Sequence, residues 1–259
     1  MKRALVTGAG KRLGAAMALY LAGRGFDVVV HYASSAEEAE GVVARITALG
    51  QRAVALQADL LDLDEMEGLL PAAAQALGGP ITCLVNNASI FEYDDVDTGD
   101  RDSWDRAMES NLRAPVVLTQ AMAAQAPEAV LDVQGEPVAQ ALVVNMIDQR
   151  VRKLTPAFMS YTIAKMGLWA FTQTAAQALA PNVRVNAIGP GPTLQGAQQT
   201  PSQFARQRAT TILARGANES DITGALRYFL GAEGVTGQLI CVDGGQHLAW
   251  QTPDVMDVE

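Results

Sequence analysis

The sequence predicts a doubly wound α/β domain in which helices cover both faces of a parallel sheet. Apolar runs of strand length alternate with segments of helical length through most of the 259 residues. These runs are apolar throughout, which indicates strands that are buried on both faces. A hydrophobic content of 49% and a charged content of 18% favour one domain with a large core. We therefore expect a single domain with seven parallel strands over residues 1–250, followed by an acidic tail at 251–259.

The expected strands and helices alternate along the chain. Strand-length runs lie at 4–7, 26–32, 52–58, 81–87, 141–147 and 182–188, and the last apolar run is QLICVDGG at 238–245. Helical segments lie at 13–23, 35–49, 62–77, 102–126 and 156–179. Residues 127–140 contain two prolines and a glycine and indicate a surface insertion. The stretch 189–202 is rich in Gly, Pro and Gln, and predicts a mobile substrate loop, extending to about 216, at the carboxyl edge of the sheet.

Composition excludes several classes of partner and site. Acidic residues outnumber basic ones by 28 to 19, so nucleic acid and anionic membranes are poor partners. Cys83 and Cys241 lie in apolar runs and are expected to be buried free thiols. The only two histidines lack metal-ligand spacing, so we expect no metal, and His31 should pack at a strand end. The first residues do not form a signal-peptide core, which favours a cytoplasmic protein.

A glycine-rich turn, TGAGKRLG at 7–14, follows the first strand and opens the first helix. Glycines permit close backbone approach, and a helix N-terminus offers N–H groups to a pyrophosphate, as in Rossmann-like folds. An acid after the second strand would bind the ribose 2′-hydroxyl of NAD, but the segment His31–Ser35 has none. Two hydroxyls there and the cations Lys11 and Arg12 fit a 2′-phosphate. We therefore expect NADP instead of NAD.

Tyr161 and Lys165 form a Tyr-x-x-x-Lys pattern in a segment expected to be helical. A spacing of four residues places both side chains on one helix face, about 5–6 Å apart at Cβ. A neighbouring ammonium lowers the pKa of a tyrosine from about 10 and gives a proton donor useful near neutral pH. We therefore expect Lys165 to lower the pKa of Tyr161 and the pair to perform acid–base chemistry.

Together these motifs resemble the short-chain dehydrogenase/reductase family over nearly the whole chain. The matching segments are TGAGKRLG, Asp59-Leu60, Asn86-Asn87-Ala88, Asn111, the Tyr161 and Lys165 pair, Pro190-Gly191 and Val242-Asp243-Gly244-Gly245. The resemblance implies that Tyr161 is the general acid, that Lys165 binds the nicotinamide ribose, and that Asn111 anchors a proton-relay water.

The resemblance also implies the cofactor contacts. Asp59 and Leu60 would border the adenine, and Pro190-Gly191 would flank the nicotinamide. The cofactor-binding residues expected on this basis are Gly8, Lys11, Arg12, Leu13, Gly14, Tyr32, Ser34, Ser35, Asp59, Leu60, Asn87, Ala88, Ser89, Met146, Tyr161, Lys165, Pro190, Gly191 and Thr193.

Two departures from the common family pattern indicate a subgroup. Arg12 stands where most members carry the middle glycine of the turn, and Asp148 stands where they carry a serine. With VVNMIDQ, QADL and NNAS-x-Phe, these departures resemble the pteridine reductases and dihydromonapterin reductases. In that subgroup the arginine contacts the pyrophosphate and reaches the pterin, the phenylalanine stacks on the pterin, and the aspartate faces the ring. The implied substrate-binding residues are Arg12, Ser89, Phe91, Asp148 and Tyr161.

The aspartate at 148 also has a chemical meaning of its own. A serine hydroxyl donates to a ketone oxygen, whereas an ionised carboxylate only accepts and would repel a developing alkoxide. Asp148 therefore suits a ring that presents N–H donors, or a C=N bond whose nitrogen needs a proton. We include it with Tyr161, Lys165 and Asn111 among the candidate catalytic residues. A structural aspartate at a strand end is the alternative.

The sequence thus predicts an NADPH-dependent reductase that transfers a hydride to a dihydropterin or dihydrofolate-like ring. Two alternatives remain: a ketone or 3-oxoacyl reductase of the same family, and an NADP-binding protein without turnover. The segment Met166–Phe171 is apolar all round, and residues 114–118 and 121–124 are nearly so, so each should bury a second face. The resembling family pairs these two helices across a twofold axis, and we expect a homotetramer.

Overall fold

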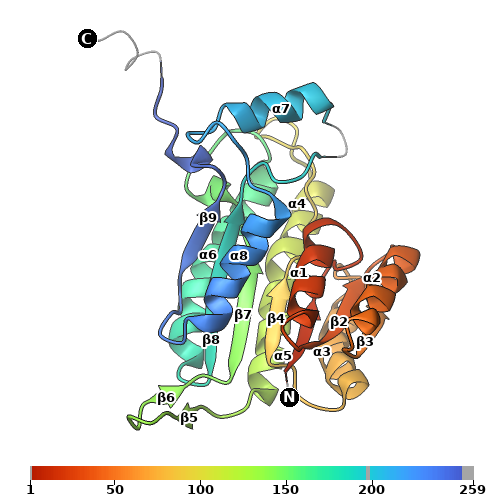
Figure 1. The fold of residues 1–259 in the computed structure, drawn as a ribbon. Helices are drawn as coiled ribbons and strands as arrows, with labels where there is room; N and C mark the ends of the chain where they lie inside the picture. The colour runs from red at the N-terminus through yellow and green to blue at the C-terminus, as the bar shows by residue number, and fades with distance from the viewer. Residues whose placement is uncertain (1, 197–198, 253–259) are drawn as a thin grey trace.

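Seven parallel strands form the central sheet of the structure, a computed structural model that describes residues 2–196 and 199–252. Their order across the sheet is β3-β2-β1-β4-β7-β8-β9 (Figure 1). The strands are β1 (Arg3–Val6), β2 (Asp27–Tyr32), β3 (Ala53–Gln57), β4 (Cys83–Asn86), β7 (Ala141–Met146), β8 (Val183–Pro190) and β9 (Leu239–Val242). The predicted doubly wound domain with a seven-stranded parallel sheet is confirmed.

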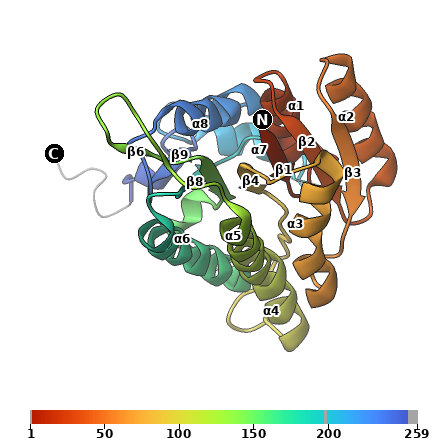
Figure 2. The same ribbon diagram turned by 90° about the horizontal axis from the view of Figure 1, so that it is seen from below.

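Helices cover the sheet on both faces, as the view in Figure 2 shows. One face packs against α1 (Arg12–Ala22), α2 (Ala36–Ala48) and α8 (Glu219–Gly231). The opposite face packs against α3 (Leu63–Leu77), α5 (Ala114–Gln125) and α6 (Met159–Leu179). Local chemistry sets some of these boundaries: Asp62 caps α3 through the Glu65 N–H, and Gly78 ends it in a left-handed conformation with φ of 71°.

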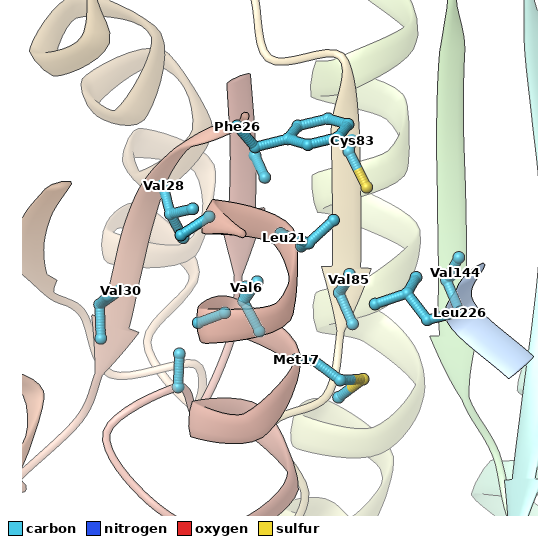
Figure 3. Packing of buried hydrophobic residues seen from close by; sticks show 14 of the residues in the cluster. Val6, Met17, Leu21, Phe26, Val28, Val30, Cys83, Val85, Val144 and Leu226 are labelled. Atoms are coloured by element: carbon cyan, nitrogen blue, oxygen red, sulfur yellow. The ribbon is translucent and has the colours of Figure 1, made fainter. Parts of the chain in front are cut away.

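Each face of the sheet has its own core because successive strand side chains point to opposite sides. Val6, Val85 and Val144 meet Met17 of α1 and Leu226 of α8 on one face (Figure 3). Their immediate neighbours in the strands, Leu5, Leu84 and Val143, belong to the core cluster on the other face. This two-sided burial explains why the strands are apolar throughout.

The predicted helix at 102–126 is helical over residues 101–125 but is not α-helical throughout. It consists of α4 (Arg101–Met108), a π-helical turn at Glu109–Arg113, and α5. The π-helical turn does not alter the apolar periodicity of this segment, so the sequence did not predict it. Such turns inside α-helices occur frequently at functional sites, and this one contains Asn111.

The two segments expected to be irregular contain short elements. The surface insertion at 127–140 forms a hairpin of β5 (Val130–Leu131) and β6 (Pro137–Val138), at the opposite end of the sheet from α7 (Pro201–Ala209) in Figure 1. Helix α7 lies inside the predicted loop 189–216, so this segment is not a loop throughout. Its capping box at Thr200 and Gln203 explains the helix start. Of the expected tail, residues 253–259 lie outside the described part.

The burial of the two cysteines and of His31 can be compared with the expectations from the sequence. Cys83 is buried, but Cys241 is only half-buried, and both are free thiols. His31 is 2% exposed in β2, as expected for a packed strand residue. Across the described ranges, no helix is both long enough and apolar enough to cross a membrane.

Candidate active site

The predicted site residues gather at the carboxyl edge of the sheet. The direction of strand order reverses between β1 and β4, and in such sheets ligands bind outside the carboxyl ends of the strands at this reversal. The glycine turn follows β1, residues 87–91 follow β4, Asp148 follows β7, and Pro190 ends β8. The fold therefore brings the cofactor motif and the reacting groups to one edge.

The turn after β1 is too tight for side chains at several positions. A Cβ on Gly14 would lie 2.2 Å from the Gly8 carbonyl oxygen, and one on Gly10 would lie 2.8 Å from Oγ of Ser35. Gly8 has a φ of 61°, and Arg12 has a φ of 54°. The left-handed backbone at Arg12 explains why a glycine is common at this position in the resembling family.

The side chains of His31, Thr7 and Asn87 hold this turn. The sequence did not predict this role for any of the three. The Gly8 N–H donates to Nδ1 of His31 at 3.0 Å, and the other ring nitrogen of His31 lies 3.0 Å from the Ala58 carbonyl oxygen. His31 is therefore the neutral tautomer that donates from Nε2, and burial lowers its pKa. Thr7 accepts from the backbone N–H groups of Asn87 and Ala88, each at 2.9 Å. Asn87 Nδ2 donates to the Thr7 carbonyl oxygen at 2.8 Å.

The N-terminus of α1 fits an anionic pyrophosphate. No side chain caps it, and its first turn contains no acidic residue. Its N–H groups and the positive end of its dipole therefore face the tight turn without a competing carboxylate.

The cations of the turn have protein partners. Lys11 Nζ lies 2.5 Å from Oε1 of Glu38, and both side chains are about half exposed. This ion pair borders a hollow of about 450 Å³ that is also lined by Arg45. The Arg12 guanidinium donates to the carbonyl oxygens of Gln195, at 2.8 Å, and Leu194, at 3.3 Å. Arg12 thus links the glycine turn to the segment after β8.

The predicted adenine and ribose contacts lie at the ends of β2 and β3. Tyr32 ends β2 and is half-buried, Ser34 is exposed, and Ser35 begins α2 without a side-chain capping bond. Asp59 accepts from the Leu61 N–H at 2.9 Å, and Leu60 is buried. Because β2 and β3 are neighbours in the sheet, these two segments lie at one edge.

Asp148, Tyr161 and Lys165 form one cluster. The Tyr161 hydroxyl donates to Oδ2 of Asp148 at 3.1 Å, and Lys165 Nζ donates to the Met146 carbonyl oxygen at 2.9 Å. The ammonium lies 5.5 Å from the centre of the Tyr161 ring. Tyr161 and Lys165 are almost completely buried in α6. The four-residue spacing therefore brings both side chains together on one face of α6, as predicted.

The expected direction of the Tyr161 pKa shift is wrong. Burial, followed by the charge and hydrogen bond of Asp148, raises the pKa of Tyr161 well above its usual value. Burial also raises the pKa of Asp148 and lowers that of Lys165 to about 8. The sequence pattern alone did not include this neighbouring carboxylate. A tyrosine with a raised pKa stays protonated near neutral pH, and it holds that proton more tightly than a free tyrosine does.

Asn111 and Ser89 are joined to each other. Ser89 Oγ donates to Oδ1 of Asn111 at 2.6 Å, and Asn111 Nδ2 donates to the carbonyl oxygens of Ile90 and Ala107. The Asn111 side chain is thus bonded at both ends to protein groups. It fixes the segment after β4 to the π-helical turn.

Phe91 contacts two aromatic residues at the start of α6, Phe158 at its N-cap and Tyr161 in its first turn. Its ring stacks on Phe158 with centroids 4.1 Å apart and an interplanar angle of 8°. It meets Tyr161 edge-on at 4.7 Å, and 52% of Phe91 remains exposed. Phe91 therefore provides an aromatic wall beside the acid.

A buried carboxylate fastens the same segment to α6. Asp94 accepts from the Ser160 N–H at 3.1 Å and from the Ser160 hydroxyl at 2.5 Å. The Asp94 carbonyl oxygen accepts from the N–H groups of Phe158 and Met159. These contacts fix the start of α6 next to Phe91, although no sequence motif indicates them.

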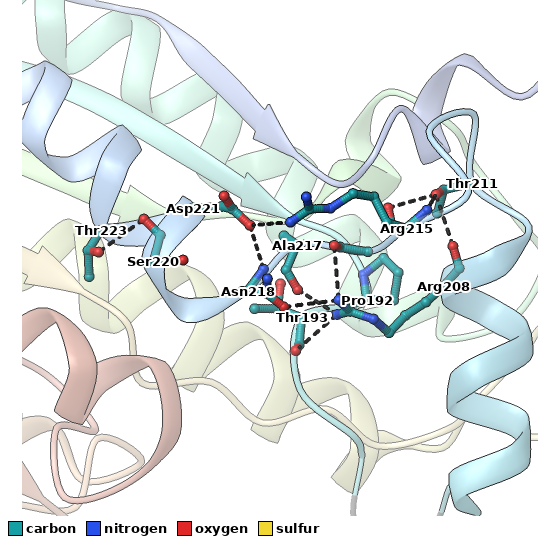
Figure 4. A network of polar contacts seen from close by, with 11 residues as sticks. Pro192, Thr193, Arg208, Thr211, Arg215, Ala217, Asn218, Ser220, Asp221 and Thr223 are labelled. Carbon is teal, nitrogen blue, oxygen red and sulfur yellow. Dashed lines mark hydrogen bonds and ion pairs between the residues drawn. The ribbon is translucent and has the colours of Figure 1, made fainter.

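The segment after β8 closes the site on its remaining side. Pro190 ends β8, a Cβ on Gly191 would lie 2.5 Å from Cβ of Asp243, and the Thr193 hydroxyl donates to the Gly191 carbonyl oxygen. Arg208 of α7 donates to the carbonyl oxygens of Pro192 and Gly216 and to the Asn218 side chain (Figure 4). Arg208 thus anchors α7 to both ends of the predicted substrate loop.

Comparisons with known proteins agree with this architecture. The sequence model of a family described as short chain dehydrogenase matches residues 2–205. FolM alternative dihydrofolate reductase 1 from Brucella suis, crystallised with NADP, has a TM-score of 0.90 and 44% identity over 98% of both chains. A short chain dehydrogenase from Burkholderia cenocepacia, also with NADP, has a TM-score of 0.84 and 32% identity, over 96% of this chain and 98% of that one.

Curated sequences give a second type of relative. The 3-oxoacyl-(acyl-carrier-protein) reductase FabG of Staphylococcus aureus is 31% identical over 252 residues, which are 95% of this chain and 98% of that protein. Family match, fold and motif geometry agree over most of the length. The chain therefore belongs to the short-chain dehydrogenase/reductase family.

Proposed function

We propose that the protein is an NADPH-dependent reductase that transfers a hydride to the ring of a dihydropterin, which includes dihydrofolate-like substrates. The observation that carries this proposal is the hydrogen bond between Tyr161 and Asp148. It puts a carboxylate, in place of a hydroxyl donor, beside the general acid. A carboxylate accepts from ring N–H groups, whereas it opposes the negative charge that develops on a ketone oxygen.

NADP is the cofactor that the residues fit. The uncapped α1 N-terminus is open to a pyrophosphate, and the segment after β2 has no carboxylate before Glu37. Both solved relatives named above are described as complexes with NADP. The relative at 44% identity is described as an alternative dihydrofolate reductase, which supports a pteridine substrate. When bound, the reduced cofactor supplies the hydride.

The protein's own groups would bind, orient and protonate the substrate. Phe91 is half exposed and would contribute aromatic surface beside a planar ring, and Asp148 would accept from the ring's N–H groups. Tyr161 is protonated near neutral pH and would donate its hydroxyl proton to the ring nitrogen as the neighbouring carbon receives the hydride. Lys165, whose ammonium donates to the Met146 carbonyl oxygen, would bind the nicotinamide ribose.

A substrate panel tests this proposal. The protein is incubated with NADPH and, separately, dihydrobiopterin, dihydromonapterin, dihydrofolate, a simple ketone and a 3-oxoacyl thioester, while the loss of NADPH absorbance is followed. We expect the largest kcat/KM for a dihydropterin. Faster reduction of the ketone or thioester would favour the carbonyl reductase. Binding of NADPH with no turnover of any substrate would favour a protein that only binds the cofactor.

We also propose a homotetramer. Ile163 and Met166 on the outer side of α6 are 42% and 39% exposed, and no charged residue lies between them except the buried Lys165. An apolar helix face of this kind is stabilised by burial in an interface. Light scattering at micromolar concentration should give a tetramer, and Met166→Glu should give smaller species. A monomeric parent protein would contradict this proposal.

A further inference from the structure

Arg150 is a charged residue that the proposed mechanism does not use. It lies in the short 3-10 turn Gln149–Val151 between β7 and α6. Its backbone N–H donates to Oδ1 of Asp148 at 2.8 Å. Its Nη1 donates to Oγ1 of Thr155 at 2.7 Å and to the Ala157 carbonyl oxygen at 3.5 Å. Arg150 thus bridges the segment that connects Asp148 with the helix of Tyr161.

The same guanidinium spans the aromatic pair beside the acid. Its central carbon lies 4.9 Å from the centre of the Phe158 ring and 5.9 Å from that of Phe91. Because the two ring centres are only 4.1 Å apart, these distances put the guanidinium beside the rims of the stacked pair and not over a ring face. A carbon 4.9 Å from a ring centre is within van der Waals range of the nearest ring atoms, so the guanidinium packs against the wall. Arg150 therefore contacts the wall of the site and holds the segment after Asp148.

The charges around Asp148 come from several elements. Arg150 lies on its own turn, Tyr161 and Lys165 lie on α6, and the Cys241 thiol lies on β9. The pKa of Cys241 is raised to about 11, so this thiol is neutral near pH 7. Ser89 also faces Tyr161 but carries no charge. The positive charge of Arg150 lowers the pKa of both Asp148 and Tyr161 and partly offsets the effect of burial.

We propose that Arg150 is a positioning residue of the reductase site: it holds the Phe91 and Phe158 wall and supplies the positive charge that faces the Asp148 and Tyr161 pair. The assignment rests on the proposed function, because it gives Arg150 its task through Asp148, Tyr161 and Phe91. Arg150 acts through these residues and takes no part in proton or hydride transfer itself.

The pH profile of kcat/KM separates this role from simple structural support. Without the nearby cation the Asp148 pKa rises. Arg150→Gln should therefore move the limb of the pH profile that reports the Asp148 pKa to higher pH by about one unit. If turnover needs the ionised carboxyl, Asp148 sets the acidic limb of the profile; if it needs the protonated carboxyl, Asp148 sets the basic limb. Both limbs follow the Asp148 pKa, so both move to higher pH. Arg150→Lys retains the charge and should leave the limb in place. It loses the planar fork that reaches Thr155 and Ala157, so the KM for the dihydropterin should rise.

Two further variants serve as controls. Arg152, two residues along, lies 5.6 Å from the ring of Trp169, and Arg152→Gln should leave both the limb and KM unchanged. Thr155→Val removes one partner of the Arg150 guanidinium without changing any charge. It should raise KM less than Arg150→Lys does and should not move the limb. Circular dichroism and the Kd for NADPH establish that each variant is folded.

A stability cycle tests the same contact without any substrate. Thermal midpoints are measured for Arg150→Gln, Phe91→Leu and the double variant. If the guanidinium contacts the ring, the double variant should lose about 1–2 °C less of the thermal midpoint than the sum of the two single losses. The corresponding cycle with Arg152→Gln should be additive.

The two proposals fail in distinguishable ways. If the proposed pterin function is wrong, the parent protein turns over no dihydropterin. The stability cycle then tests whether Arg150 holds the aromatic wall. A limb that stays in place in Arg150→Gln, in a parent that does reduce dihydropterins, overturns the proposed role of its charge. An additive Arg150 and Phe91 cycle overturns the proposed hold on the wall.

Discussion

The Tyr161 hydroxyl donates to Oδ2 of Asp148 across 3.1 Å, so two ionisable groups share one contact at the centre of the candidate site. The charge and hydrogen bond of Asp148 add to burial in raising the pKa of Tyr161. A serine in place of Asp148 would leave Tyr161 beside a neutral hydroxyl. The aspartate therefore gives this site an acid with a firmly held proton and an acceptor next to it.

Phe91→Ala should raise the KM for the dihydropterin severalfold and leave the Kd for NADPH nearly unchanged. The alanine removes an aromatic wall whose stacking contributes about 0.5–1.5 kcal/mol beyond buried area. Steady-state kinetics and a fluorescence titration with NADPH measure the two quantities.

Tyr93→Ala is the matched control for Phe91. Tyr93 is also exposed and meets Phe158 edge-on at 5.4 Å, but no ring contact joins it to Tyr161. Its variant should keep the parent KM. An unchanged KM in Phe91→Ala would mean that this ring only covers the core.

Acid should weaken both the fold and the cofactor site through His31. Burial lowers the pKa of His31 in the folded protein below the usual value of about 6.5. Below about pH 6.5, His31 in the unfolded chain therefore binds a proton, whereas buried His31 in the folded protein stays neutral. The free energy of unfolding that neutral His31 contributes above that pH is lost as the pH falls through its folded pKa. Protonation also removes the acceptor that holds the Gly8 N–H.

Thermal midpoints and the Kd for NADPH, measured between about pH 7.5 and about pH 5, test the role of His31. The chain has two histidines, so His247→Gln leaves His31 as the one histidine that titrates. The loss of stability and affinity should persist in His247→Gln and should become smaller in His31→Gln. An identical pH dependence in His31→Gln and the parent would contradict this account.

Glu38→Gln should tighten the binding of NADPH by about two- to fivefold and leave the Kd for NADH nearly unchanged. The variant frees Lys11 from its ion pair and makes its charge available to a 2′-phosphate. Glu37→Gln is the control, because Glu37 is an exposed acid in the same first turn of α2. Equal effects of the two variants would show that net charge, and not release of Lys11, is responsible.

Much of the fold could be predicted because it depends on local patterns. The apolar runs and intervening helical segments predicted the sheet and its helices, and the spacing of Tyr161 and Lys165 predicted their common helix face. Asp148 was identified because it departs from the serine common in the resembling family. These predictions needed only periodicity, glycine placement and motif order.

The rest of the site depends on contacts between distant segments. Asp94 binds Ser160, 66 residues further along, and His31 binds Gly8, 23 residues away. The stacking of Phe91 on Phe158 and the π-helical turn at Asn111 likewise have no periodic signature. The Tyr161 pKa was predicted in the wrong direction because the four-residue pattern includes Lys165 but not the neighbouring carboxylate.

The central claim is that Asp148 adapts this family's site to a ring with nitrogen groups, and Asp148→Ser tests it most directly. NADPH binding is first confirmed for the variant. Its kcat/KM is then measured for a dihydropterin and for a ketone, with Tyr161→Phe as a reference that should depress both activities by about 10²–10⁴-fold.

We expect Asp148→Ser to lose nearly all dihydropterin reduction, because the smaller hydroxyl neither carries the charge nor reaches the ring. Weak ketone reduction should appear or rise, because the hydroxyl now donates to a carbonyl oxygen beside Tyr161. An Asp148→Ser variant that reduces the dihydropterin as fast as the parent protein would contradict the account.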